Sequence, residues 1–124
     1  MNYSEARILI IDDEKALLKM LNQRLNRIGI ALVDVAETAE EGIKKINSNK
    51  YDLILTDIKM PGMSGNDVFN HVRTQIKKST PVVAMSGTPW LTEKSDFDAV
   101  LAKPFNKEEL LDVIIQFVHS LTII

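Results

Sequence analysis

The sequence predicts an α/β domain built on a five-stranded parallel sheet with helices on both faces. Apolar runs typical of strands alternate with segments of helical periodicity along all 124 residues. The first run, residues 8–11, has four consecutive branched or leucine side chains and no polar alternation, as a central strand buried on both faces requires. With 45% apolar residues, a chain of this length has room for one core, so residues 1–124 are expected to form a single, free-standing domain.

The other four strands are predicted from apolar runs of similar length. These runs cover residues 32–36, 53–55, 82–85 and 99–102. Asp34 interrupts the run at residues 32–36, and a charged residue within a strand favours a position at the edge of the sheet.

Three of the expected helices open on an N-cap residue followed three positions later by an acid, the pattern of a capping box. The pairs are Thr38 with Glu41, Ser64 with Asp67, and Asn106 with Glu109. A further helix is predicted from leucines at helical spacing over residues 17–28, and Gly29 is a common type of C-terminal stop. The last helix is expected to continue through Leu121.

The segment between the last two strands is unusual. Residues 88–98, "TPWLTEKSDFD", must supply two loops and have little apolar periodicity. A helix in this segment is expected to be one or two turns long, or absent.

Composition excludes several kinds of protein. The net charge of −2 comes from interspersed signs, and no run of Lys or Arg is long enough to follow a nucleic-acid backbone. The absence of cysteine excludes disulfides and thiolate metal sites and fits a reducing compartment. Residues 1–7 are polar and have no signal-peptide core, and no apolar run approaches the roughly 20 residues that span a bilayer. We therefore expect a soluble, cytoplasmic protein that binds neither nucleic acid nor a membrane.

Reactive polar residues follow four of the five apolar runs. Asp12 and Asp13 follow the first strand, Asp57 the third, Ser86 the fourth and Lys103 the fifth. Ligands of open parallel α/β sheets bind outside the carboxyl ends of the strands. These five residues are therefore expected to converge in one crevice.

Three carboxylates in one crevice predict a metal site. At about 5 Å and an effective dielectric near 20, each pair of carboxylates repels by roughly 3 kcal/mol. Lys103 supplies one positive charge against three negative ones, whereas Mg²⁺ prefers oxygen ligands and also neutralises a phosphoryl group. Asp57 is then a plausible nucleophile toward phosphorus, with Ser86 and Lys103 donating hydrogen bonds to phosphoryl oxygens.

Four stretches, "ILIIDDE", "DLILTDIKMPGMSG", "PVVAMSG" and "VLAKPF", resemble the receiver domain of two-component response regulators, in particular the single-domain, chemotaxis-regulator-like members. The match covers nearly the whole chain. The resemblance implies a flavodoxin-like fold with strand order 2-1-3-4-5, no output domain, and action as a switch in a phosphorelay. It also implies that a histidine kinase or histidine phosphotransfer protein supplies the phosphoryl group, and that a downstream protein, which the sequence does not name, receives the signal.

The same resemblance implies a role for each strand-end residue. Asp57 accepts the phosphoryl group, Asp12 and Asp13 bind Mg²⁺ with Asp57, and the backbone carbonyl of Lys59 is the remaining protein ligand. Ser86 is the switch hydroxyl and Lys103 pairs with the phosphate. The peptide bond between Lys103 and Pro104 is expected to be cis. The side chain of Lys59 is a candidate for slowing attack by water.

Two departures from the family pattern concern signal output. The family usually has an aromatic residue three positions before the lysine, and this chain has Val100 there. The segment from Ser86 to Lys103 is also shorter than usual, which truncates the fourth helix. Output is therefore expected to leave by another route.

The sequence is compatible with other roles for some of these residues and with two other functions. Asp12 and Asp13 could cap the first helix, and Ser86 could simply form a turn. A binding module that keeps the pocket but lacks a conventional switch is one alternative function. A phosphatase with an aspartate nucleophile is another, but it requires an acid two residues after Asp57, where this chain has Lys59.

Two histidines and the single tryptophan are not expected to take part in the chemistry. His71 and His119 are expected to face solvent, and Trp90 is expected to anchor a loop.

Overall fold

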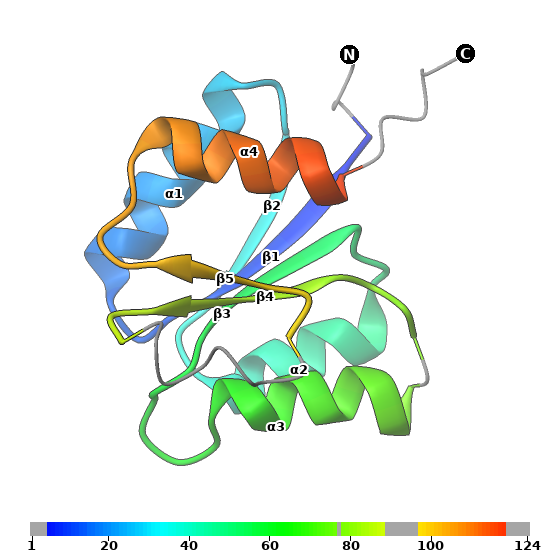
Figure 1. Cartoon of the computed structure of the whole chain (residues 1–124). Coiled ribbons are helices and arrows are strands. Elements are labelled where there is room, and N and C mark those ends of the chain that lie inside the picture. The colour runs from blue at the N-terminus through cyan, green and yellow to red at the C-terminus, as the bar shows by residue number, and fades with distance from the viewer. Residues whose placement is uncertain (1–4, 77, 89–96, 119–124) are drawn as a thin grey trace.

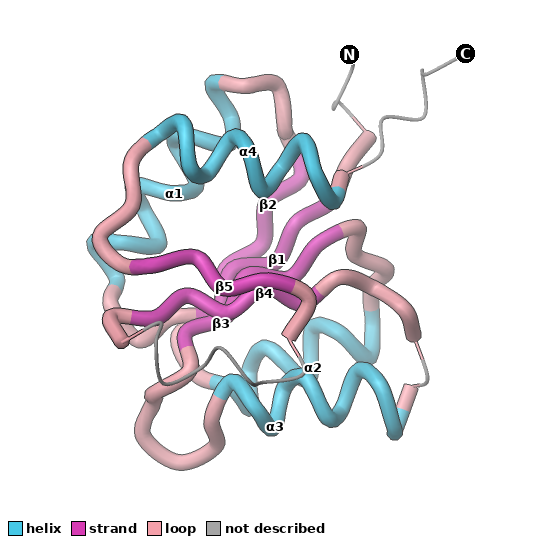
Figure 2. Tube along the Cα trace, viewed as in Figure 1, coloured by secondary structure: helices cyan, strands magenta, loops and turns pink. Residues whose placement is uncertain are grey.

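The computed structural model describes residues 5–76, 78–88 and 97–118, and it contains one sheet of five parallel strands (Figures 1 and 2). The strands are β1 (Arg7–Ile11), β2 (Leu32–Ala36), β3 (Leu53–Asp57), β4 (Val82–Ser86) and β5 (Ala99–Ala102). Their order is β2-β1-β3-β4-β5, so the α/β class, the flavodoxin-like topology and the edge position of β2 are confirmed.

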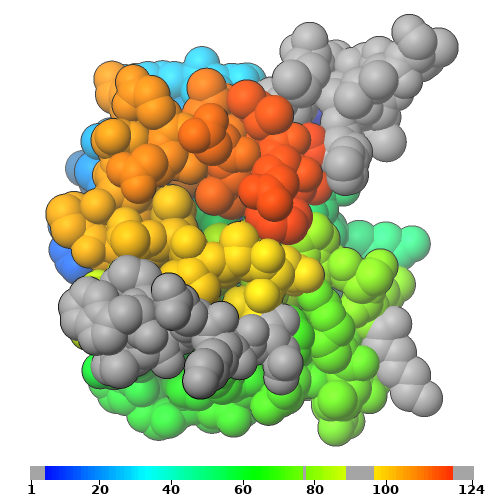
Figure 3. All heavy atoms as spheres, in the orientation of Figure 1, coloured from blue at the N-terminus to red at the C-terminus, as the bar shows by residue number. Residues whose placement is uncertain are grey.

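Helices cover both faces of the sheet. The helices are α1 (Lys15–Arg27), α2 (Ala39–Ser48), α3 (Gly65–Asn70), the π-helix η1 (His71–Gln75) that continues α3, and α4 (Lys107–Phe117). In Figure 1, α1 and α4 lie on one face and α2 and α3 on the other, and Figure 3 shows α4 over one part of the visible surface and α3 over another.

Alternation along β1 explains the two layers. Ile8 and Ile10 pack with the side chains of α1 and α4, whereas Leu9 and Ile11 pack with those of α2, α3 and η1. All four are fully buried, which is why the first run shows no polar alternation.

The register of the strands determines which side chains meet at the carboxyl edge. Ile11 pairs with Thr56 and Ser86 with Ala102. Asp12 therefore follows β1 beside the end of β3, and Lys103 follows β5 beside Ser86.

The predicted helix starts are largely confirmed. Asn106 and Glu109 form a complete capping box, and the backbone N–H of Ser64 donates to the carboxylate of Asp67 at 2.8 Å. For α2 the prediction was half wrong: Thr38 accepts from the N–H of Glu41, but the Glu41 carboxylate lies 3.5 Å from Lys45 instead of capping the helix. An exposed acid has a choice of partners, and the i,i+4 lysine is one of them.

The ends of α1 and α4 differ in how well they were predicted. Gly29, with φ of +104°, follows α1 as expected. The prediction that the last helix continues through Leu121 was wrong, because α4 ends at Phe117 and Val118 is extended. Val118 is nearly fully buried in the α1/α4 layer, and tertiary packing there overrides the apolar periodicity of the sequence.

Several predictions fall on residues outside the described part of the chain. They concern Trp90, His119 and most of the short segment between β4 and β5. The described ends of that segment, residues 87–88 and 97–98, contain no helix. None of the described helices has the length and hydropathy that crossing a bilayer requires.

Candidate functional site

The acids at the carboxyl edge of the sheet lie together. One carboxylate oxygen from each of Asp12, Asp13 and Asp57 lies within 4.8 Å of the other two. Asp12 is buried with 1% of its surface exposed, Asp57 is half-buried and Asp13 is exposed. The three acids therefore converge at the carboxyl edge of the sheet, as the strand ends predicted, and Asp13 is exposed to solvent.

Local backbone structure positions the acid pair. The N–H of Asp12 donates to the carbonyl of Ala36, which continues the β1–β2 ladder by one residue. The carboxylate of Asp12 also accepts the N–H of Glu14 at 2.9 Å. Glu14 is the N-cap of α1 and makes no side-chain cap bond, so Asp12 stabilises the turn before the helix rather than capping the helix itself.

Lys103 lies between two of the acids. Its ammonium nitrogen is 2.6 Å from Oδ2 of Asp12 and 3.5 Å from Oδ1 of Asp57. The N–H of Lys103 donates to the carbonyl of Ser86 at 2.7 Å, which holds the start of the loop beside β4. The Lys103–Pro104 peptide is cis, as expected from the family resemblance.

The electrostatics of the cluster are unbalanced. Burial raises the pKa of Asp57, Lys103 opposes that rise, and the charge of Asp12 adds to it, so that the pKa lies above the ordinary aspartate value. Burial lowers the pKa of Lys103, but the bonds and charges of Asp12 and Asp57 outweigh it and leave the pKa raised. One ammonium among three carboxylates leaves an excess of negative charge that suits a divalent cation with oxygen ligands.

Ser86 ends β4 as predicted and is 5% exposed. Its hydroxyl oxygen accepts the N–H of Thr88 at 3.0 Å and lies 3.5 Å from the Thr88 hydroxyl. Ser86 therefore stabilises the turn after β4, which is one of the two roles considered for it. This role does not exclude a second one, because the Ser86 hydroxyl hydrogen remains available for donation. Sequence reasoning missed Thr88, although a second hydroxyl two residues after Ser86 was a readable signal.

Two glycines shape the loop after β3. Gly62 has φ of +80°, which fits the tight turn predicted at Pro61-Gly62. The N–H of Gly65 donates to the carbonyl of Ile58, and a Cβ on Gly65 would lie 2.5 Å from the backbone oxygen of Asp57. Only glycine allows this approach. Lys59 is exposed on the same loop, and its carbonyl as a metal ligand stays a prediction.

Two other residues singled out in the sequence lie outside the acidic cluster. Val100 is half-buried in β5, where it pairs with Ala84. His71 was expected to face solvent, but it is half-buried and its Nε2 lies 2.6 Å from Oδ1 of Asn47. This bond links η1 to α2 because the two helices pack side by side, so His71 does not contribute to the cluster.

Comparison with known proteins points to one family. The model of the response regulator receiver domain matches residues 8–115. The transcriptional regulatory protein ResD of Bacillus subtilis is 33% identical over 113 residues, which are 87% of this chain and 46% of ResD. The transcriptional regulatory protein GlrR of Escherichia coli is 30% identical over 92% of this chain and 26% of GlrR. The chain thus spans less than half the length of these relatives.

Solved structures agree with this comparison. The response regulator TrrA of Thermotoga maritima, in complex with Mg²⁺-BeF, has a TM-score of 0.82 and 33% identity, and the match covers 91% of this chain and 99% of TrrA. The chemotaxis response regulator CheY4 of Vibrio cholerae has a TM-score of 0.80 and 28% identity, with 91% of this chain and 98% of CheY4 covered. With the family model matching most of the sequence and the sheet order matching the fold, the chain belongs to the response regulator receiver domains of two-component signalling.

Proposed function

We propose that this domain is a phosphoacceptor switch in which Asp57 receives a phosphoryl group from a phosphohistidine on a partner kinase or phosphotransfer protein. The observation that carries the proposal is the convergence of Asp12, Asp13 and Asp57 within 4.8 Å, with Lys103 between two of them. Membership in the receiver family supports the same role.

The donor set fits Mg²⁺. Asp12, Asp13 and Asp57 offer carboxylate oxygens, and the carbonyl of Lys59 is the fourth candidate ligand from the protein. When bound, Mg²⁺ supplies positive charge that offsets the carboxylates and the incoming phosphoryl oxygens. The likeness to TrrA, whose structure holds Mg²⁺-BeF, supports this assignment.

The chemistry is a displacement at phosphorus. A carboxylate oxygen of Asp57 forms a P–O bond while the P–N bond to the donor imidazole breaks, and the imidazole nitrogen leaves with the electron pair. The product is an acyl phosphate on Asp57. Lys103 has three N–H donors, so it can keep its bond to Asp12 and still donate to a phosphoryl oxygen.

Ser86 is the proposed reporter of phosphorylation. Its hydroxyl oxygen is held by the N–H of Thr88, and the hydroxyl hydrogen can turn toward a phosphoryl oxygen. Rotation of Ser86 would also disturb its contact with Thr88, so the backbone after β4 would respond to the phosphoryl group. Val100 provides no aromatic ring for the usual readout, which is why we place the first response at Thr88.

A groove beside Lys103 is the proposed docking place of the phosphodonor. It has a volume of about 300 Å³, and its lining residues are Glu14, Leu17, Met20, Lys103, Pro104 and Phe105. The side chains of Leu17, Met20 and Phe105 give this groove an apolar surface at the edge of the acidic cluster. A donor domain seated there would present its phosphohistidine next to Asp57.

The proposed function concerns one domain and a small set of reactions. The single domain without an output domain stays a prediction. In the proposed role the chain catalyses only its own phosphorylation and a slow hydrolysis of the acyl phosphate. A hydrolase is disfavoured by Lys59, which stands two residues after Asp57 where such enzymes need an acid.

One experiment tests the proposal. The protein is incubated with Mg²⁺ and acetyl phosphate and its intact mass is measured, with Asp57→Asn as the control. We expect a single base-labile phosphoryl group on the wild-type chain and none on the variant. Absence of the label refutes the proposal, and rapid release of free phosphate over many turnovers favours the hydrolase. Amide shifts confined to the cluster on addition of beryllofluoride favour a binding module without a switch.

A further inference from the structure

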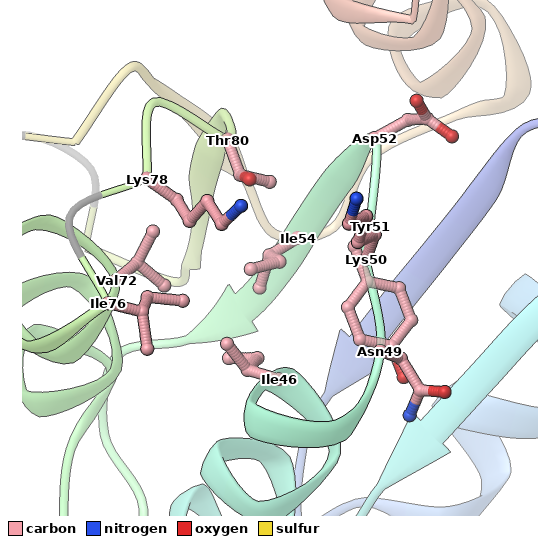
Figure 4. A pocket seen from close by; sticks show the side chains of 10 residues that line it. All are labelled: Ile46, Asn49, Lys50, Tyr51, Asp52, Ile54, Val72, Ile76, Lys78 and Thr80. Carbon is pink, nitrogen blue, oxygen red and sulfur yellow. The ribbon is translucent and has the colours of Figure 1, made fainter.

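A cavity of about 280 Å³ lies at the amino end of the sheet, opposite the acidic cluster (Figure 4). The chain just before β3 contributes Asn49 to Asp52, and the chain just before β4 contributes Lys78 and Thr80. The remaining wall comes from α2, β3 and η1. No residue of the acidic cluster lines this cavity, so the proposed phosphorylation chemistry does not account for it.

The inner wall is apolar and fixed. Its side chains are Ile46, Tyr51, Ile54, Val72 and Ile76. Figure 4 shows Val72, Ile76 and Lys78 on one side and the ring of Tyr51 on the other, with the Lys78 ammonium pointing toward the middle of the cavity above Ile54. The Tyr51 hydroxyl donates to Asp34 at 2.6 Å, and the Arg7 guanidinium lies 5.4 Å from the ring centroid, so the aromatic wall is held in place before any ligand arrives.

The π-helix gives this wall an unusual backbone. The N–H of Ile76 donates to the carbonyl of His71, five residues back, and the N–H of Lys78 donates to the carbonyl of Val72. A π-turn is wider than an α-turn, and it occurs mostly as a short insertion that is frequent at functional sites. Here it lies where α3 meets the cavity and presents Val72 and Ile76 to it.

The rim of the cavity carries positive charge. Lys50 and Lys78 are exposed, and within the described residues neither ammonium forms an ion pair. The one acid of the lining, Asp52, accepts the backbone N–H of Arg7 at 2.8 Å. A rim with two ammonium groups and one carboxylate that already has a partner favours an anion, although the chain as a whole has a net charge of −2.

We propose that this cavity binds a small organic anion with an apolar body, such as an aromatic or branched monocarboxylate. The body would lie against Tyr51, Ile54 and Val72, and the carboxylate would accept hydrogen bonds from Lys78 and Lys50. The volume suits a compact ligand, and an apolar wall with a few convergent polar groups is the usual composition of small-molecule sites.

The test uses three probes that differ only in the head group: 4-phenylbutyrate, 4-phenylbutan-1-ol and 4-phenylbutylamine. Each is titrated into ¹⁵N-labelled full chain. We expect saturable shifts of the amides of Ile54, Val72 and Ile76 with the carboxylate, and binding of the alcohol weaker by about tenfold because charge-assisted bonds are lost. The amine should bind more weakly still.

Two substitutions and two controls make the test specific. Lys78→Glu should weaken binding of phenylbutyrate by about tenfold, whereas Lys44→Glu, an exposed lysine of α2 outside the lining, should not. Ile76→Trp should fill the cavity and abolish binding in a protein that keeps a dispersed amide spectrum. Asp57→Asn should bind phenylbutyrate as the wild type does, which separates this inference from the proposed phosphorylation.

Three results would overturn the inference. They are no saturable shift with phenylbutyrate, shifts that map outside the cavity, and equal binding of the carboxylate and the alcohol. Equal binding would mean that the lysines take no part and that the cavity is merely apolar. An unchanged affinity in Lys78→Glu would overturn the assignment of the head group to that lysine.

Discussion

Two aspartates of the same sheet, Asp34 on β2 and Asp57 at the end of β3, show opposite shifts of pKa. Burial raises the pKa of Asp34, but hydrogen bonds from Tyr51 and Arg7 outweigh it, so the pKa lies below its usual value. One oxygen of Asp34 accepts the Tyr51 hydroxyl at 2.6 Å and the Arg7 guanidinium at 2.9 and 3.2 Å. The protein therefore stabilises the charge of Asp34.

Asp57 lacks comparable partners. Lys103 is 3.5 Å away and already donates to Asp12 at 2.6 Å, while the charge of Asp12 works against ionisation of Asp57. The difference shows that a half-buried carboxylate can contribute to stability or remain available for chemistry, according to its partners. Asp34 is satisfied within the fold, and Asp57 is left for a partner from outside.

The largest expected effect separates the two residues directly. Asp57→Asn should abolish phosphorylation and also raise the melting temperature, because it removes a charge that burial and Asp12 disfavour. Asp34→Asn should keep phosphorylation and lower the melting temperature. Acetyl phosphate labelling of both variants in the presence of Mg²⁺ measures the first effect, and thermal unfolding of both variants without metal measures the second. A stabilising Asp34→Asn or a destabilising Asp57→Asn would reverse the comparison.

Lys103→Gln is expected to reduce stability by about 3 kcal/mol, since it leaves the buried carboxylate of Asp12 without its cation. Urea unfolding checks the loss. Addition of Mg²⁺ should restore more stability to this variant than to the wild type, because the metal then replaces a missing charge. Lys19→Gln, at an exposed lysine of α1, is the matched control. Equal stabilisation of variant and wild type by Mg²⁺ would argue that the metal binds elsewhere.

Asp34→Ala should lower the free energy of unfolding by about 2 kcal/mol, since both Tyr51 and Arg7 lose a charged acceptor. Urea unfolding at neutral pH measures it. A loss of free energy of unfolding below a few tenths of a kcal/mol would show that the Asp34 network contributes no more than a solvated surface ion pair.

Tyr51→Phe is the milder test of the same network, with an expected loss of about 1 kcal/mol. Burial and the bond to Asp34 raise the pKa of Tyr51, so the phenol stays protonated and donates throughout the neutral range. A double-mutant cycle with Asp34→Ala isolates the bond, and additive losses would mean that the hydroxyl and the carboxylate do not interact in solution.

The smallest effects are expected in the pH dependence of stability. Folding lowers the pKa of Asp34. The contribution of Asp34 to the free energy of unfolding is therefore complete above its pKa in the unfolded chain, about 3.9, and disappears as the pH falls through its pKa in the folded protein. Folding raises the pKa of Asp57, so its ionised carboxylate destabilises the fold at neutral pH. Acidification through the pKa of Asp57 in the folded protein removes this destabilisation. The gain in Asp57→Asn should therefore shrink as the pH falls toward about 4, while the loss in Asp34→Ala persists until lower pH. Urea unfolding of the two variants across this pH range gives the dependence of each free energy of unfolding on pH. The same pH dependence in both variants would contradict opposite pKa shifts of Asp34 and Asp57.

Most of the fold could be predicted because its signals are local. The buried runs gave the strands, and the carboxyl ends of parallel strands necessarily share one edge, which placed Asp12, Asp57 and Lys103 together. The features that were missed depend on packing between segments far apart in sequence. The partners of Asp34 are Arg7 of β1 and Tyr51, two residues before β3, whereas in the sequence alone Asp34 indicated only an edge strand.

Other misses have related causes. The end of α4 is set by the burial of Val118, not by periodicity, and the π-helix after Asn70 has no sequence pattern that distinguishes it from an α-helix. The cavity beside η1 could not be foreseen either, because its walls come from two stretches, residues 46–54 and 72–80, that are far apart in sequence. The need for glycine at position 65 became visible only with the Asp57 carbonyl in place.

The central claim is that Asp57, and no other aspartate, accepts a phosphoryl group. Sodium borohydride reduces an aspartyl phosphate to homoserine, so treatment after incubation with Mg²⁺ and acetyl phosphate, followed by tandem mass spectrometry, identifies the residue. We predict homoserine at position 57 alone, dependent on Mg²⁺, with Asp12, Asp13 and Asp34 unchanged. Homoserine at any of those three positions, or at none, would contradict the account.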